Sequence, residues 1–348
     1  MKILRVKIIW SYQKIHNVEG NKKMAKNKDK KERISVGGEA LIEGIMMNGP
    51  KGAAIAVRKA DGSIHTEKKE FRRLKDKVKI LGWPVMRGVV SFAETMIFGY
   101  KCMMESAEIS GKFEDDTQEG EKSKVDLWLE KHMGEKFTAA IMVAASAIAV
   151  VMSIFLFIWF PAFIVDMAEK LLKFTIGNFR PAIEVVIRMA VLVTYMYLVS
   201  RIKDIKRTFM YHGAEHKTIF CFESGEELNV ENVRKQKRFH PRCGTSFIFV
   251  VLVISVFVST ALNLAFPGLR ESRLVWTAAK LAIMPVIMGI GYEFIRFAGK
   301  HDNIFVKILS APGLAMQRIT TIEPSDDMIE IGIASLKAVV EESGDGEV

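Results

Sequence analysis

The sequence predicts an α-helical integral membrane protein: a four-span helical bundle with an interfacial helix and a small cytoplasmic β-containing unit near the N-terminus. Two observations carry this prediction. Four apolar stretches are each long enough to cross a hydrocarbon core of about 30 Å, which needs roughly 20 residues; they cover residues 137–165, 181–199, 246–266 and 274–295. Lysine and arginine gather in the connection between the second and third stretches, as expected for a cytoplasmic loop.

The first 34 residues are basic, and we expect them to form a disordered extension. The apolar stretch at 6–10 is too short for a signal peptide, and no small-residue cleavage site follows it, so we expect no cleavage. Met24 precedes the lysine-rich run 26–31, so either Met1 or Met24 is the biological start.

Residues 35–80 are predicted to form the small β-containing unit. Segments 53–57 and 63–67 have extended character and flank Asp61-Gly62, a dipeptide typical of hairpin turns. The glycines at 37, 38, 44 and 49 are expected to break up the chain before this hairpin.

An amphipathic helix is predicted at 83–108. Its charged residues Arg87, Glu94 and Lys101 recur every seven positions and form one polar stripe. This pattern favours a helix lying in the cytoplasmic interface. The alternative is a fifth span whose stripe faces the bundle; it would cost roughly 2.5 to 3.5 kcal/mol per charge and would move the β-containing unit across the membrane.

The other predicted segments precede, connect and follow the four spans. A polar linker and lead-in helix occupy 113–136, spans one and two 137–200, the loop 201–245, spans three and four 246–297 and the tail 298–348. The loop holds ten lysine and arginine residues, so it is assigned to the cytoplasm, and an even number of spans places both termini there too. In the tail we expect a loop at 312–324 and an amphipathic helix capped by Ser325.

The net charge of +10 predicts attraction to a bilayer with anionic head groups. No nucleic-acid-binding module accompanies this charge, so we expect no nucleic-acid partner. The three cysteines, Cys102, Cys221 and Cys243, are odd in number and assigned to the cytoplasmic side, so we expect reduced thiols.

The residues with reactive chemistry lie in the 201–245 loop. His212, Glu215 and His216 form an H-x-x-E-H arrangement, which on a helix places both imidazoles on one face. Two imidazoles can hold zinc while the glutamate deprotonates a water. His240 and Cys243 precede span three, and imidazole and thiolate are both good zinc ligands. If spans two and three are neighbours, the two clusters meet at the membrane surface.

The sequence therefore predicts a zinc site formed by His212, His216, His240 and Cys243, with Glu215 as the catalytic base. Four ligands would complete a tetrahedron and make the metal structural, whereas three would leave one position open for catalysis. The simpler interpretation is that the histidines contact lipid phosphates or cap helices, and that Cys243 is a small buried residue.

A family resemblance rests on the strings YHGAEHK at 211–217, HPRCGTS at 240–246 and GGEALIEG at 37–44, and it includes APGL at 311–314 and QRITTIEP at 317–324 in the tail. These resemble the YqhQ-type family of bacterial membrane proteins, a family with a domain of unknown function that is described as metal-dependent. The resemblance extends over about residues 36–336. It implies a multi-pass protein of the bacterial plasma membrane with a metal site, and it implies no particular substrate or reaction.

Further charged residues are candidates for function: Glu39 and Glu43 in the N-terminal unit, and Glu184, Arg188, Glu293 and Arg296 near span ends. The first two could supply a ligand or line a substrate groove, although such residues are commonly solvated. Charges inside a membrane are functional candidates by default, but near span ends they also form ion pairs or extend toward the surface.

Three function classes follow from these observations. The H-x-x-E-H arrangement favours a metal-dependent hydrolase that acts on a peptide, ester or lipid-linked substrate at the cytoplasmic membrane face. The second class is a non-enzymatic scaffold, assembly factor or regulator with a structural zinc, acting on an unspecified peptide, lipid or protein partner. The third is a transporter that uses the charged span ends, which the lack of an internal repeat disfavours.

Overall fold

The computed structural model describes residues 36–49, 52–70, 79–112, 135–240, 243–298 and 304–340. The predicted extension at 1–34 and most of the predicted linker at 113–136 lie outside these ranges, as do residues 341–348. The chain divides into a unit of Met1–Val36 and a unit of Gly37–Val348, and every element named below belongs to the second.

The N-terminal part of this second unit is a four-stranded antiparallel sheet in the order β1-β2-β3-β4. The strands are β1 (Gly37–Leu41), β2 (Gly44–Asn48), β3 (Ala53–Arg58) and β4 (Ile64–Lys69). The predicted hairpin is confirmed: β3 and β4 pair around Asp61-Gly62, where Gly62 takes a φ of 84° that glycine adopts without strain.

The glycine-containing segment at 37–49 forms two strands, so the expectation that its glycines break up the chain was wrong. The glycines instead permit close packing. A Cβ on Gly38 would lie 2.8 Å from the Cγ atom of Glu215, and a Cβ on Gly44 would lie 2.7 Å from the carbonyl oxygen of Ala56. Glycine in β1 and β2 therefore lets a helix and a neighbouring strand approach the backbone.

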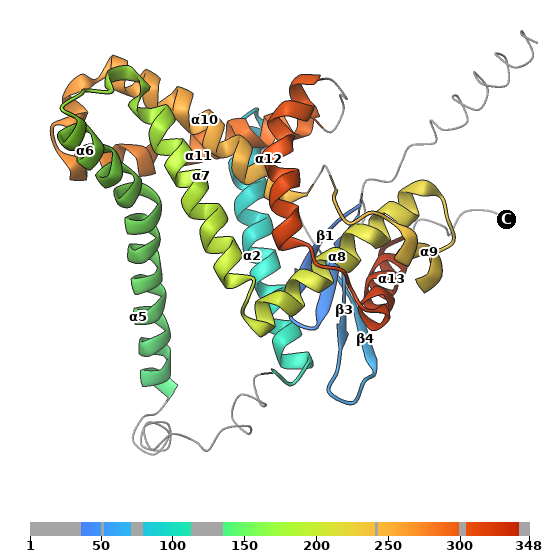
Figure 1. The fold of residues 1–348 in the computed structure, drawn as a ribbon. Coiled ribbons are helices and arrows are strands. Elements are labelled where there is room, and N and C mark those ends of the chain that lie inside the picture. Colours follow the sequence, from blue (N-terminus) through green and yellow to red (C-terminus); the bar gives the residue numbers. More distant parts are fainter. Residues whose placement is uncertain are drawn as a thin grey trace, which may run out of the picture. The chain divides into compact units, whose positions relative to one another are not determined.

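Helix α2 (Met86–Ile109) joins the sheet to a span (Figure 1). Its C-terminal half contributes Cys102 to a buried cluster with Leu41, Ile55 and Val57. Its first turns pack on α11 (Arg273–Ala298), where Gly88 approaches so closely that a Cβ would lie 2.9 Å from the Gly289 Cα. The predicted helix is thus confirmed, and it is not among the candidate spans. Its position in the membrane interface stays a prediction.

Helices α8 (Lys203–Ser224) and α13 (Asp326–Val340) also pack on the sheet. Strand β3 alternates large and small residues: Ile55 and Val57 belong to the α2 cluster, and the alanines between them point the other way. The small alanines let α13 lie close, and the Ser335 hydroxyl donates to the Ala54 carbonyl at 3.0 Å. The sheet is therefore covered on both faces.

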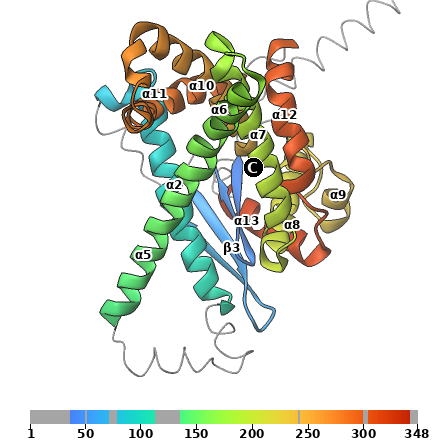
Figure 2. The same ribbon diagram turned by 60° about the vertical axis from the view of Figure 1, so that its left-hand side comes forward.

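Four helical segments are long and apolar enough to cross a membrane: Ala144–Leu172, Arg180–Val199, Gly244–Ala265 and Arg273–Ala298. The first is built from α5 (Glu135–Ile154), a π-helical turn η3 (Phe155–Trp159) and α6 (Phe160–Leu172), and the next two are α7 and α10 (Figure 2). The first extends past its predicted end at residue 165. Asp166 and Glu169 continue the helix there because both form ion pairs with Arg180.

Two connecting regions contain more helix than predicted. The 201–245 loop consists mainly of α8 and the short α9 (Val230–Lys235). The expectation of a loop at 312–324 was wrong in its first part, because α12 (Ile304–Thr320) continues through Pro312. The packing of α12 along α10 compensates for the helix hydrogen bond that is lost because proline has no backbone N–H. Gly313 makes this packing close, since a Cβ there would lie 2.5 Å from the Ser246 Cα. Shorter turns are η2 (Lys79–Gly82), η4 (Gly177–Phe179) and η5 (Pro267–Arg270).

A first prediction concerns Gly213 of α8, which the chain after α12 crosses. Ile322 donates its N–H to the Phe209 carbonyl at 2.9 Å, and a Cβ on Gly213 would overlap the Ile322 carbonyl oxygen. We expect Gly213→Ala to lower the free energy of unfolding by about 2 kcal/mol through overpacking. Thermal unfolding in detergent measures this, with Gly268→Ala as control because no atom lies within 4 Å of its added Cβ. Equal melting temperatures for the two variants would contradict the prediction.

Candidate metal centre

Three of the four predicted zinc ligands come together in the structure: His212 and His216 from α8, and Cys243 from the residue before α10. One ligand atom from each lies within 4.8 Å of the other two. Helix α8 sets the two imidazoles one turn apart, with ring centroids separated by 4.4 Å. The predicted meeting of the two sequence clusters is confirmed for these three residues.

Backbone carbonyls orient both imidazoles. His212 Nδ1 lies 2.8 Å from the carbonyl oxygen of Thr320, the last residue of α12, and His216 Nδ1 lies 2.5 Å from the carbonyl oxygen of Arg238. A carbonyl only accepts, so each Nδ1 carries the hydrogen and each Nε2 keeps a free electron pair. Such carbonyl partners are the usual outer supports of metal-binding histidines.

The donor set fits a zinc ion. His216 Nε2 is buried and has no hydrogen-bond partner among the residues that the structure describes, which is costly for a polar atom unless something binds it. In a tetrahedral site, Zn–N and Zn–S bonds of about 2.0 and 2.3 Å separate nitrogen from sulfur by about 3.5 Å. His212 Nε2 and Cys243 Sγ are 3.3 Å apart. Burial lowers the pKa of His216, which favours the neutral imidazole that a metal requires.

His240, the fourth predicted ligand, lies outside this group of three. Its Nε2 is 3.7 Å from a carboxylate oxygen of Glu223, and its ring packs against Phe220 and, at 5.6 Å between centroids, against His216. Gln317 fixes its backbone, accepting from the His240 N–H at 2.7 Å and donating to its carbonyl at 2.8 Å. Ligation by His240 stays a prediction.

Gln317 was not found by sequence reasoning. It is fully buried in α12, and its side chain bonds to the chain that leads to Cys243. The hydroxyl of Thr245 adds a contact of 3.4 Å to the Cys243 sulfur. The string QRITTIEP at 317–324, which carried part of the family resemblance, was the one signal that pointed to this region.

Glu215, the predicted base, turns toward the sheet. Its side chain lies against Gly38 of β1, and its Oε2 is buried with no hydrogen-bond partner among the described residues. Burial raises the pKa of Glu215 to about 7, an effect that nearby His212 opposes and Glu39 reinforces. A carboxyl group with this pKa can exchange a proton near neutral pH.

The other two acidic candidates of the N-terminal unit have different surroundings. The Glu39 carboxylate lies against Gly99 of α2, and burial raises its pKa. Glu43 pairs with the Arg207 guanidinium and accepts a hydrogen bond of 2.9 Å from the Tyr211 hydroxyl. Glu43 therefore holds the β1–β2 turn to α8.

The remaining cysteines are not part of the cluster. Cys102 and Cys221 are buried, and neither they nor Cys243 form a disulfide in the described structure. Cys102 belongs to the sheet core, and Cys221 lies on the same helix as the two histidines, where its sulfur is 3.5 Å from the Glu227 carbonyl oxygen.

The fold and the site together define a mostly helical protein, in which a covered sheet and a His-His-Cys cluster adjoin four helices that are long and apolar enough to span a membrane. The chain belongs to the family described as "Protein of unknown function (DUF1385)", which matches residues 83–342. It is similar to "Uncharacterized protein YqhQ" of Bacillus subtilis (strain 168), with 32% identity over 308 residues that cover 87% of this chain and 92% of that protein. No solved structure matches it.

A second prediction tests the metal centre. We expect the protein, purified in detergent without chelator, to contain about one metal ion per chain by elemental analysis, because the three ligand atoms are preorganised. His212→Ala, His216→Ala and Cys243→Ala should each lower the metal content at least tenfold. His65→Ala is the control, since His65 lies on β4 beside Glu67. Metal retained by His216→Ala, or absent from the unmodified protein, would contradict the assignment.

Proposed function

We propose that this protein is a zinc-dependent hydrolase of the bacterial plasma membrane that acts at the cytoplasmic face. The observation that carries the proposal is the convergence of His212, His216 and Cys243, whose ligand atoms lie within 4.8 Å of one another, together with a buried His216 Nε2 that has no hydrogen-bond partner among the described residues. Three protein ligands and one open position are typical of catalytic zinc, which supplies Lewis acidity to the substrate bond.

Residues around the cluster orient its ligands and accept a proton. The carbonyls of Thr320 and Arg238 hold the imidazoles in the tautomer that offers Nε2. Glu215 lies one helical turn from His212, with a buried oxygen that has no partner in the described chain, and we assign it the role of proton acceptor. His212 and Cys243 are half-buried, so access to the cluster is from their side.

The proposed substrate is a peptide, ester or lipid-linked compound that reaches the membrane surface. Arg201, Lys203 and Lys206 are exposed where α7 gives way to α8, and they supply the positive charge that would hold this end against anionic head groups. The same positive charge supports placing the sheet, the cluster and both termini in the cytoplasm.

A second candidate function is a membrane scaffold or regulator with a structural metal. This candidate is supported by the burial of the site. His216 is 1% exposed and Glu215 is 5% exposed, which leaves little room for a substrate beside His216. In this case the metal would tie α8 to the start of α10, and Glu215 would only fill space against Gly38.

A third prediction separates the two candidates. Glu215→Gln keeps the shape of the side chain, so we expect it to retain the metal while losing turnover by at least a hundredfold, the usual contribution of a general base. Cells that produce Glu215→Gln or His216→Ala at matched levels would be compared by untargeted mass spectrometry of membrane lipids and peptides. Hydrolysis predicts that the same compound accumulates in both.

The control for this comparison is Glu231→Gln, because Glu231 is an exposed residue of α9 that pairs with Lys235 on the same helix. If Glu215→Gln matched the unmodified protein while His216→Ala alone changed the cells, the hydrolase would be excluded and the scaffold supported.

A further inference from the structure

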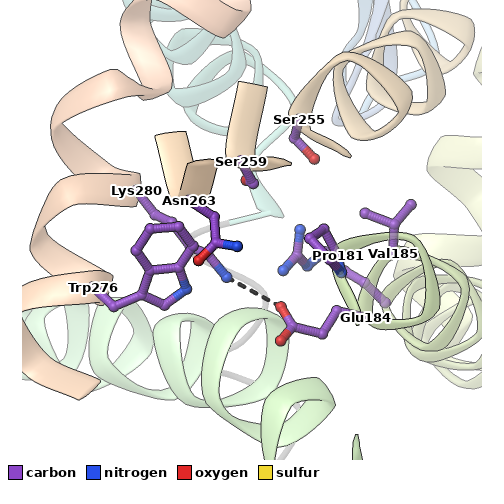
Figure 3. Close-up of a pocket in the computed structure, with 9 residues that line it drawn as sticks. Pro181, Glu184, Val185, Ser255, Ser259, Asn263, Trp276 and Lys280 are labelled. Carbon is purple, nitrogen blue, oxygen red and sulfur yellow. Dashed lines mark hydrogen bonds and ion pairs between the residues drawn. The ribbon is translucent and has the colours of Figure 1, made fainter. Parts of the chain in front are cut away.

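A second polar site lies among the spans, far from the metal centre. Its lining comes from α7, α10 and α11 and includes Glu184, Arg188, Ser255, Ser259, Asn263 and Lys280 (Figure 3). Ser259 follows Cys243 by 16 residues along α10, a distance of about 24 Å at the helical rise. The pocket and the metal cluster therefore lie toward opposite ends of the same helix.

The charges around this pocket do not balance. Three acidic residues pair with three cations: Arg180 bonds to Asp166, Glu169 and Glu184, Lys280 lies 3.1 Å from Glu184, and Arg273 bonds to Asp166. A fourth cation, Arg188, has no carboxylate within 4.0 Å among the described residues. Its one hydrogen bond runs from Nε to the Phe157 carbonyl in the π-helical turn, at 2.6 Å.

An unbalanced guanidinium inside a membrane bundle calls for a negative partner. Arg188 has five N–H donors, and its bond to Phe157 uses one of them. The two serines, Asn263 and Lys280 line the same pocket and add polar groups around it. Arginine with hydroxyl and amide neighbours is the donor set that suits phosphate and carboxylate oxygens.

The size and depth of the pocket indicate how such an anion enters. The enclosed space is about 10 Å³, the room that one water molecule or one oxygen atom needs. Asn263 and Trp276 line the pocket within about 5 Å of the ends of α10 and α11, near the level expected for lipid phosphates, whereas Arg188 lies eight residues inside α7, about 12 Å from its start. One oxygen of a head group can enter while the rest of the molecule stays outside the bundle.

We propose that the pocket lined by Arg188, Ser255, Ser259 and Asn263 binds an oxyanion, the phosphate of an anionic lipid, at the end of the spans opposite the metal centre. This site is independent of the proposed hydrolase, because no metal ligand contributes to it.

Native mass spectrometry of the full chain in detergent tests the proposal, with phosphatidylglycerol and phosphatidylcholine titrated separately. We expect the unmodified protein to bind its first phosphatidylglycerol at least tenfold more tightly than phosphatidylcholine, and Arg188→Gln to lose this preference. Arg188→Lys should retain part of it. Arg201→Gln is the matched control, because Arg201 is an exposed arginine beyond the other end of α7 that stacks on Tyr197.

Two further measurements decide the source of the anion and guard against misfolding. If inorganic phosphate raises the melting temperature of the unmodified protein but not of Arg188→Gln, while the lipid has no effect, the site takes a free oxyanion. If Arg188→Gln fails to run as a single species in size-exclusion chromatography, Ser259→Ala replaces it, with an expected severalfold loss. Equal binding of both lipids together with no response to phosphate, or binding unchanged in a folded Arg188→Gln, would overturn the proposal.

Discussion

The buried polar face of α8 is the constraint on which the rest of the structure depends. Glu215, His216, Lys217 and Thr218 are all buried, and buried polar groups must find partners. The surrounding chain supplies partners for Lys217 and for one nitrogen of each imidazole: Lys217 Nζ bonds to the Arg234 carbonyl at 2.9 Å and to Glu323, and the Nδ1 atoms of His212 and His216 bond to carbonyls from other segments. A helix of this kind folds only when α9, the end of α12 and the chain around residue 238 are all in place.

The same partners build the candidate site, so stability and function share their contacts. Thr320 ends α12 and orients His212 in one bond, while Ile322 ties the next residues to α8. Gln317, one turn earlier, fixes the chain that delivers Cys243. Because all three of these contacts use backbone groups, the site tolerates little change in how the chain at the end of α12 crosses α8, and Gly213 is needed at that crossing.

Sequence reasoning predicted the parts governed by strong local patterns and missed those governed by tertiary contact. Long apolar stretches predicted the four helices that could span a membrane, and the Asp61-Gly62 dipeptide predicted the hairpin of β3 and β4. Metal-ligand chemistry predicted the three residues that the structure groups together. Strands β1 and β2 were missed because their glycines are set by tertiary packing. Gly38 makes room for the Glu215 side chain, and Gly44 makes room for the backbone of the neighbouring strand β3. The helical structure around Pro312 was missed because the packing of α12 on α10 outweighs the tendency of proline to end a helix. Gln317 has no motif of its own, and only its buried position reveals its role.

The charge pattern of the two sites follows one rule, that a buried site is complementary to what it binds. The His-His-Cys cluster presents imidazole nitrogens and a sulfur, a donor set that suits a soft divalent cation. The pocket among the spans presents a surplus arginine, which suits an anion. Glu184 lines the same pocket, but its carboxylate already pairs with Arg180 and Lys280, so these ion pairs leave Arg188 without a carboxylate of its own. Arg188 lies one turn beyond Glu184 and donates to the Phe157 carbonyl, so its remaining N–H donors are available to the anion that we propose for this pocket.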